Sequence, residues 1–197
     1  MKDIFNTLKQ DIEMLKRKDR HLRIFGAASH NYKLNPTLSE SHLLTFEEKH
    51  KITLPDDYRL FLKEVGNGGV GPYYGMFPLE NFYQSRFYDG SDENCIGNDF
   101  LQTPFPYSKN NPFVENEMDD DLTDEVYAQE FIKNLNGTIT LAHQGCGYFD
   151  MLIVSGEDKG KVWIDARVSD YGMNCIFDSF TEWYFHWLNA SIKECVQ

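Results

Sequence analysis

One stretch near the middle of the chain, Ile52–Leu79, constrains the fold more than any other. Near its start lies Pro55, which suits the first turn of a helix because the N–H group that proline lacks has no partner there. The next two residues are aspartates, and negative charge is stabilising at a helix N-terminus. An apolar stripe at helical spacing follows, made of Tyr58, Phe61, Leu62 and Val65. The stretch therefore predicts a short amphipathic helix.

A glycine-rich turn is predicted to follow this helix. Gly66 falls where a left-handed residue would end it. The turn continues with residue types that tolerate positive φ or close backbone approach, namely Asn67, Gly68, Gly69 and Gly71. Pro72–Leu79 is rich in aromatic residues and predicts a strand that contains Tyr74. Gly75 interrupts this strand, as a bulge or a point of close approach.

The Leu54–Leu79 run resembles the SUKH superfamily, in its Smi/Knr branch; it reads LPDDYRLFLKEVGNGGVGPYYGMFPL. The resemblance extends to Phe25–Pro36, to Leu141–Arg167 and to the Trp-rich final helix, and Leu101–Lys133 is the least family-like part. It implies structural roles for Leu54, Pro55, Tyr58, Gly66, Asn67, Gly68, Gly69, Gly71, Pro72, Tyr74 and Gly75. It also implies an α+β domain without catalysis. Many bacterial members are immunity proteins that bind and neutralise a toxin, whereas fungal relatives regulate cell-wall synthesis and signalling.

Length and composition fit one folded domain over residues 1–197. A chain of 197 residues, 41% of them hydrophobic and 15% aromatic, can bury a sufficient core without disulfides. Its four cysteines form no CxxC pair, its first residues lack the apolar core of a signal peptide, and no apolar run reaches membrane-span length. These features predict a cytoplasmic protein with reduced thiols and no membrane association.

The net charge of −12 disfavours nucleic acid as a partner, because binding to phosphates requires clustered Lys and Arg. The charge is uneven: residues 1–34 hold eight basic and four acidic residues, so the remainder carries −16. An acidic surface steers basic partners towards the protein. The alternative is that this acidity only keeps the protein soluble.

Hydrophobic periodicity predicts the other elements. Residues 1–19 form an amphipathic helix, and Thr37 or Ser39 caps a second helix that runs to about His50. Strands are predicted at 138–142, 148–155, 161–165 and 171–177, with a tight hairpin loop at 157–160. Ser179 and Glu182 form a capping box for the last helix, whose aromatic stripe is predicted to cover a twisted, mainly antiparallel sheet.

Residues 81–125 form an irregular insertion, aromatic at first and then acidic. Its aromatic residues, among them Tyr83 and Tyr88, either anchor a partner or pin the insertion to the core. The acidic part contains Glu115, Glu117, Asp119, Asp120, Asp121 and Asp124, followed by a helix at Thr123–Asn134. An EF-hand loop is excluded by its missing glycine and glutamate. The acids are either a solvated cap for that helix or a surface that binds a charged partner.

No catalytic, metal-binding or cofactor-binding residues are predicted. His143 and Cys146 lie close in sequence, but their spacing fits neither a caspase nucleophile nor a zinc site. The sequence therefore favours a non-catalytic immunity protein that binds a basic toxin, with the acidic residues of the insertion, Tyr83 and Tyr88 as candidate contacts. Two alternatives remain: a regulatory or scaffolding protein like the fungal relatives, and an enzyme that uses the 81–107 loop as a lid. The oligomeric state is left open.

Overall fold

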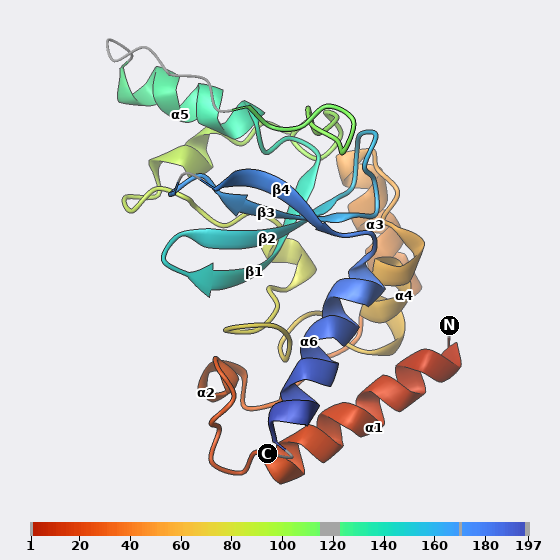
Figure 1. Ribbon diagram of the computed structural model, residues 1–197. Helices are drawn as coiled ribbons and strands as arrows, with labels where there is room; N and C mark the ends of the chain where they lie inside the picture. The colour runs from red at the N-terminus through yellow and green to blue at the C-terminus, as the bar shows by residue number, and fades with distance from the viewer. Residues whose placement is uncertain (1, 115–122, 170, 196–197) are drawn as a thin grey trace.

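The structure is a computed structural model and describes residues 2–114, 123–169 and 171–195 (Figure 1). Helices pack on a four-stranded sheet and lie at both ends of the chain, which confirms the predicted α+β class. The helices are α1 (Lys2–Lys18), α2 (Ala27–His30), α3 (Glu40–His50), α4 (Asp56–Glu64), α5 (Asp124–Lys133) and α6 (Phe180–Glu194), with short 3-10 helices η1 (Leu79–Asn81) and η2 (Ser91–Cys95). The strands are β1 (Thr138–Gly145), β2 (Tyr148–Ile153), β3 (Val162–Ala166) and β4 (Gly172–Phe177).

The sheet is an antiparallel meander in the order β1-β2-β3-β4. All four strands lie close to their predicted ranges, although β1 runs three residues further than expected and β2 ends two residues earlier. The second strand is interior, and its residues from Phe149 to Ile153 are all buried, as a strand covered on both faces requires. Cys146 and Gly147 turn the chain between β1 and β2, so residues 143–147 form the end of β1 and the turn that follows it.

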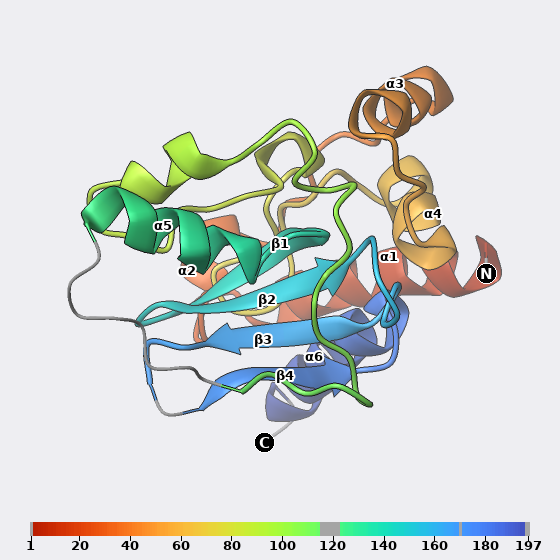
Figure 2. The same ribbon diagram turned by 90° about the horizontal axis from the view of Figure 1, so that it is seen from above.

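The two faces of the sheet are covered differently (Figures 1 and 2). On one face lies α6, whose Trp183 donates its indole N–H to Asp150 of β2 at 2.8 Å. Helices α1 and α4 pack beside α6. The irregular segment and α5 cover the other face, where Phe105 meets the ring of Trp163 on β3. The sheet is thus the middle layer of the molecule.

The final helix forms as its sequence predicts. Ser179 accepts the N–H of Glu182 at 3.1 Å, but the Glu182 carboxylate accepts the N–H of Asp178 and not that of Ser179, so the capping box is shifted by one residue. The predicted aromatic stripe is buried, apart from a half-buried Trp187. Its ring contacts with α4, such as Phe61 to Tyr184 at 5.0 Å, join the first and last parts of the chain into one core.

The glycine-rich turn after α4 differs in part from the prediction. Pro55 precedes the first helical residue, and α4 ends at Glu64, with Val65 as its right-handed C-cap. Gly66 is therefore not a left-handed cap; it is required because a Cβ there would lie 2.8 Å from the carbonyl oxygen of Asn35. Gly68 and Gly69 do adopt positive φ, at 78° and 93°. The prediction of positive φ was therefore right for Gly68 and Gly69 and wrong for Gly66.

The predicted strand at Pro72–Leu79 does not form. The segment turns at Pro72–Gly75, and only Met76 makes isolated bridges, to Gly69 and to Ala142. Gly75, at φ +103°, is the predicted point of close approach, since a Cβ there would lie 2.6 Å from the oxygen of Gly69. Asn67 is buried and fastens the turn: its amide oxygen accepts the N–H of Leu79 at 2.8 Å.

The remaining motif residues occupy two environments. Leu54, Tyr58, Gly71 and Pro72 are buried, as structural roles require, whereas Tyr74 is exposed. None of the helices in the described ranges is long and apolar enough to cross a lipid bilayer.

Candidate functional site

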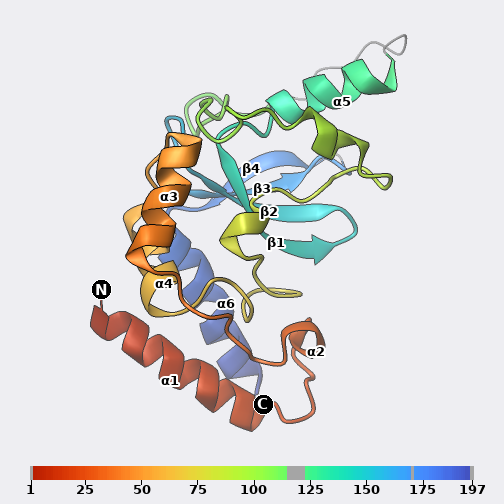
Figure 3. The same cartoon turned by 180° about the vertical axis from the view of Figure 1, so that it is seen from behind.

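The irregular insertion and α5 lie together at one end of the molecule, on the opposite side of the sheet from α2 (Figure 3). Asp124 opens α5 and is exposed, and Thr123, predicted as part of the helix, is its N-cap. Tyr88 is fully exposed, whereas Tyr83 is half-buried and its hydroxyl donates to Asp92 at 2.5 Å. The predicted contacts Glu115, Glu117, Asp119, Asp120 and Asp121 lie outside the described residues.

The aromatic residues of the insertion divide between the two roles that the sequence left open. Phe100 and Phe105 are buried and pin the insertion to the core. Phe87 also faces inward, with its ring 5.0 Å from that of Phe131 on α5. Tyr88 alone among the predicted contacts leaves its whole ring in solvent.

An exposed surface results, which we call the acidic–aromatic face. It consists of Tyr88 and Glu93 from the insertion and of Asp124, Glu125, Val126 and Tyr127 from α5. Helix η2, which carries Glu93, packs against α5, so the two parts adjoin. None of its three carboxylates forms an ion pair with a basic residue in the described ranges. The face therefore presents uncompensated negative charge beside exposed rings.

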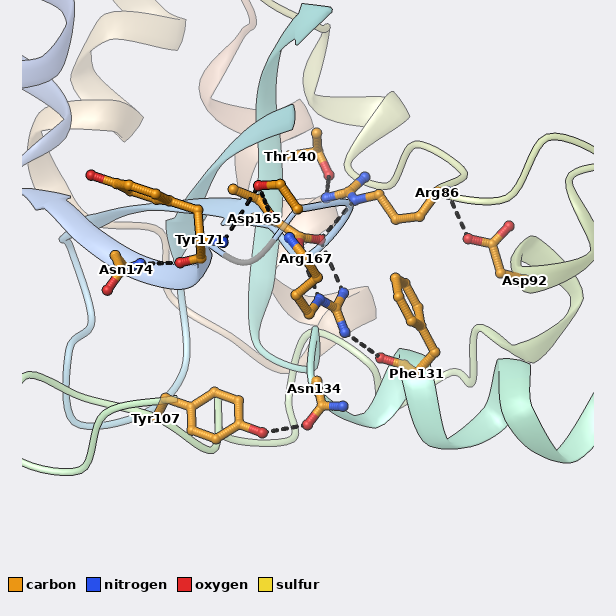
Figure 4. A network of polar contacts seen from close by, with 12 residues as sticks. Arg86, Asp92, Tyr107, Phe131, Asn134, Thr140, Asp165, Arg167, Tyr171 and Asn174 are labelled. Carbon is orange, nitrogen blue, oxygen red and sulfur yellow. Dashed lines mark hydrogen bonds and ion pairs between the residues drawn. The ribbon is translucent and has the colours of Figure 1, made fainter. Parts of the chain in front are cut away.

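A buried cluster of charges holds this face on the sheet (Figure 4). Its centre is Asp165 at the end of β3, which two guanidinium groups share. Arg167 donates to both oxygens of Asp165, at 2.8 and 3.0 Å, and Arg86 of the insertion donates to one of them at 3.2 Å. All three side chains are more than nine-tenths buried.

Each arginine fixes one part of the face. Arg167 also donates to the carbonyl oxygen of Phe131, in the last turn of α5, at 3.3 Å, and its guanidinium lies 3.7 Å from the centre of the Phe131 ring. Arg86 lies 3.8 Å above the ring of Phe149 on β2 and donates to Thr140 on β1. One carboxylate thus ties the insertion and α5 to the sheet.

A second buried carboxylate, Asp92, organises the insertion itself. It accepts the backbone N–H of Arg86 at 2.7 Å and the hydroxyl groups of Tyr83 and Ser85. Burial, and this hydrogen bond after it, raises the pKa of Tyr83 above its usual range. The role of Tyr83 seen here is to support the loop that displays Tyr88.

The three groups of the cluster, one carboxylate and two guanidinium groups, stay charged across the physiological pH range. Burial by itself would raise the pKa of Asp165, but hydrogen bonds and charge attraction from Arg167 and Arg86 outweigh it and lower that pKa. Burial lowers the pKa of Arg86, yet a guanidinium remains protonated across the physiological range. The carboxylate is ionised and fully engaged, so it serves as an anchor and not as a proton carrier.

The His and Cys residues that the sequence singled out belong to no metal-binding cluster in the described ranges. These contain no group of three or more His, Cys, Asp or Glu residues placed to hold a metal ion. The ring of His143 stacks on Phe149 at 4.5 Å, and Cys146 is exposed on the β1–β2 turn. The geometry at α5 and the insertion fits recognition of a partner by surface contact.

The sequence did not reveal the cluster. Asp165 is the last residue of a predicted strand and Arg167 lies two positions beyond it, a spacing that places both on one face where a strand continues. Arg86 is 79 positions from Asp165, so no local spacing links them. Tyr127 was also missed, because a tyrosine on a predicted helix gives no sign of whether it is exposed.

The fold and this surface define an α+β protein whose exposed features suit protein recognition. A family model, SMI1 / KNR4 family (SUKH-1), matches residues 37–185. The chain therefore belongs to the SMI1/KNR4 family (SUKH-1), as its resemblance implied. The match contains the glycine-rich turn and the whole sheet but begins after Phe25–Pro36, which had been included in the resemblance. No curated protein and no solved structure matches the chain significantly.

Proposed function

We propose that this protein is an immunity protein that binds a basic toxin stoichiometrically and covers its active surface. Membership of the SMI1/KNR4 family supports a role in protein–protein interaction. The acidic–aromatic face is the proposed contact, extended by the acidic run from Glu115 to Asp121. The toxin would be inactivated by exclusion of its substrate, without any covalent step.

One observation carries this proposal: unpaired carboxylates stand beside exposed aromatic rings on a rigidly held support. Unpaired surface charge raises the rate of encounter with an oppositely charged partner. Exposed tyrosines supply contact area at low conformational cost and are enriched at interface hot spots. The buried Asp165 cluster keeps α5 and the insertion in place, so little entropy is lost when the partner binds.

A nuclease is the toxin class that this charge suits best. Enzymes that act on nucleic acid bind a polyanion and present basic surfaces to it. An acidic inhibitor can occupy such a surface and can reach association rates of about 10⁸–10⁹ M⁻¹s⁻¹ at low salt. The proposal therefore predicts a fast association rate that falls as salt is added. It also predicts a slow dissociation rate that depends on the tyrosines and changes little with salt.

The test begins with the partner. The tagged protein is expressed in its native host, and proteins that co-purify in equal amount are identified by mass spectrometry. A partner that is toxic when expressed alone, and harmless when expressed with this protein, supports neutralisation. Repeated recovery of cell-wall synthesis or signalling proteins that are not toxic would instead favour the regulatory alternative.

A matched pair of variants then locates the contact. The first variant combines Glu93→Gln, Asp124→Asn and Glu125→Gln on the acidic–aromatic face. The control combines Glu13→Gln, Glu48→Gln and Glu194→Gln, which removes the same charge from exposed positions on three other helices. Association with the toxin, measured by stopped flow at low salt, should slow about tenfold in the first variant only.

Tyr88→Ala separates contact from steering, because it leaves the charge unchanged. It should raise the dissociation rate about tenfold or more, with the association rate nearly unaltered. Equal slowing by the two charge variants, together with no effect of Tyr88→Ala, would refute this face as the contact surface.

A further inference from the structure

The segment from Lys16 to Lys33 is basic in an otherwise acidic chain. It holds six Lys and Arg residues and one acidic residue, Asp19, whereas the whole chain carries −12. Asp19 is buried and already engaged: it accepts the N–H groups of Arg23 at 2.7 Å and Ile24 at 3.1 Å and the hydroxyl of Tyr32 at 2.6 Å. Asp19 also attracts the charge of Arg23, but it is buried and is one acidic residue against six basic ones, so the segment keeps an excess of positive charge.

Two exposed aromatic rings lie on or against the loop that carries these cations. Phe25 is 59% exposed and Tyr74 44% exposed, and their ring centres are 5.3 Å apart. Arg23 lies two residues before Phe25 and is exposed, as is Arg20. Among the described residues, neither arginine forms an ion pair with a carboxylate. We call Arg20, Arg23, Phe25 and Tyr74 the basic–aromatic patch.

The backbone beneath the patch is rigid and strained. Gly26, at φ +80°, lies so close to the turn below it that a Cβ would be 1.7 Å from the carbonyl oxygen of Tyr73. Leu22 and Tyr73 themselves have positive φ, at 52° and 54°. Bulky residues rarely adopt this conformation, and such strain is found preferentially where ligands are held. The chain thus holds the exposed groups of the patch in one fixed arrangement.

We propose that the basic–aromatic patch binds a short acidic segment of a partner protein. Arginine forks match carboxylates in bidentate geometry, and the two rings offer an apolar contact to a neighbouring side chain. This partner has the opposite charge to the toxin proposed above and binds at the other end of the molecule (Figure 3). The patch is therefore a second interaction surface, independent of the proposed neutralisation.

Two other polyanions fit the patch less well. A nucleic acid carries charge along its whole length, so the strongly negative remainder of the chain would repel what extends beyond the patch. An anionic membrane is bound by a broad amphipathic face, but the patch offers it two exposed rings, and Leu8, Ile12 and Leu15 of the adjoining helix α1 are buried in the core. A short acidic segment avoids both conflicts because it contacts only the patch.

The test uses a synthetic peptide of about ten residues, glutamates with one leucine and one phenylalanine, against the isotope-labelled full chain. Its control is the same peptide with glutamines. The protein variants are Arg20→Glu with Arg23→Glu, Phe25→Ala, and a charge-matched control, Lys49→Glu with Lys51→Glu at the end of α3. All five positions are exposed, and the melting temperature of each variant is measured so that any loss of stability is separated from loss of binding.

The proposal predicts NMR shifts of residues 20–25 and 73–74 on addition of the glutamate peptide but not the glutamine peptide. Affinity should fall about tenfold in the arginine variant and about threefold in Phe25→Ala, and should change less than twofold in the lysine control. A variant lacking the carboxylates of the acidic–aromatic face should bind the peptide normally.

Several outcomes would overturn the proposal. One is no shift at about 1 mM peptide; another is equal weakening by the arginine and lysine variants. Tighter binding of a ten-nucleotide oligo(dT), or of phosphatidylserine vesicles, through the same residues would assign the patch to nucleic acid or membrane. Self-association that the arginine variant abolishes would assign it to a second copy of this chain.

Discussion

The buried carboxyl group of Asp150 on β2 gives the protein a pH dependence that a single substitution can isolate. Asp150 is completely buried, and its hydrogen-bond donors among the described residues are neutral: the indole of Trp183 at 2.8 Å and the amide of Gln144 at 2.6 Å. Burial raises its pKa and the two hydrogen bonds offset part of that effect, so that the net result is a rise from 3.8 to about 6. The ionised carboxylate therefore costs stability at neutral pH.

The size of this cost follows from the two pKa values. Because the folded-state pKa is raised, the stabilising contribution of protonated Asp150 is complete below about pH 4 and is lost as the pH rises through about 6. The full difference, at 1.36 kcal/mol per pH unit, is roughly 3 kcal/mol. By the same linkage, the stability lost relative to the fully protonated carboxyl is about 1.6 kcal/mol at pH 5 and about 3 kcal/mol at pH 8.

Asp150→Asn removes the titration while keeping the shape of the side chain. The new amide can accept from Trp183 and donate to Gln144, whose own amide can turn to accept. The free energy of unfolding in urea, measured from about pH 5 to about pH 8, should rise relative to the parent protein by an amount that grows by roughly 1.4 kcal/mol across this range. A difference between the two proteins that is flat with pH would refute the reasoning.

Asp19→Asn serves as a control of opposite sign. Although burial alone would raise the pKa of Asp19, the hydrogen bonds from Tyr32, Arg23 and Ile24 together lower it. Its stabilising effect is therefore present at neutral pH and is lost as the pH falls through the folded-state pKa. Asp19→Asn should destabilise the protein at pH 7, and the two substitutions should have opposite effects in the same assay.

Two further predictions concern the turn and the charge cluster. Gly90→Ala should lower the free energy of unfolding by about 1 kcal/mol, and Gly75→Ala should lower it at least twice as much. Both glycines have positive φ, but only at Gly75 would a Cβ meet backbone, 2.6 Å from the carbonyl oxygen of Gly69. Equal losses in urea unfolding would contradict this. Arg167→Met should destabilise by about 3–5 kcal/mol and speed hydrogen exchange in α5 before that in α6, because it leaves Asp165 short of a partner and frees Phe131; the exposed control Arg17→Met should change neither measurement.

The sequence predicted the regular elements well because each of them carries its own periodic signal. The helix at Asp56–Glu64 and the strand at Tyr148–Ile153 follow from the spacing of their apolar residues. The segment Pro72–Leu79 failed because its aromatic composition is typical of strands, while its backbone is set by contacts with distant parts of the chain. Tyr73, for example, adopts positive φ where it packs under Gly26, a contact that no local pattern encodes.

The candidate surfaces were less predictable than the fold. Their residues were visible as charges and aromatics, but exposure depends on tertiary packing. Tyr83 and Tyr88 look alike in sequence, yet the first is held by Asp92 and the second is free in solvent. The pairing of Arg86 with Asp165 joins distant positions, and only the fold brings them together. The sequence therefore indicated the charged and aromatic residue types of the surfaces, but not which individual residues are exposed.

The two proposed surfaces rest on separate supports, and this bears on whether they influence each other. Asp165 anchors the acidic–aromatic face, and Asp19 anchors the loop that carries the basic–aromatic patch. A row of rings from Phe149 through His143 to Tyr74 runs between them. Such a row transmits a change only if its rings can pack in a second arrangement. The close contacts seen here define a single arrangement. Binding at one surface should therefore leave affinity at the other unchanged, and substitutions at the two ends should contribute additively.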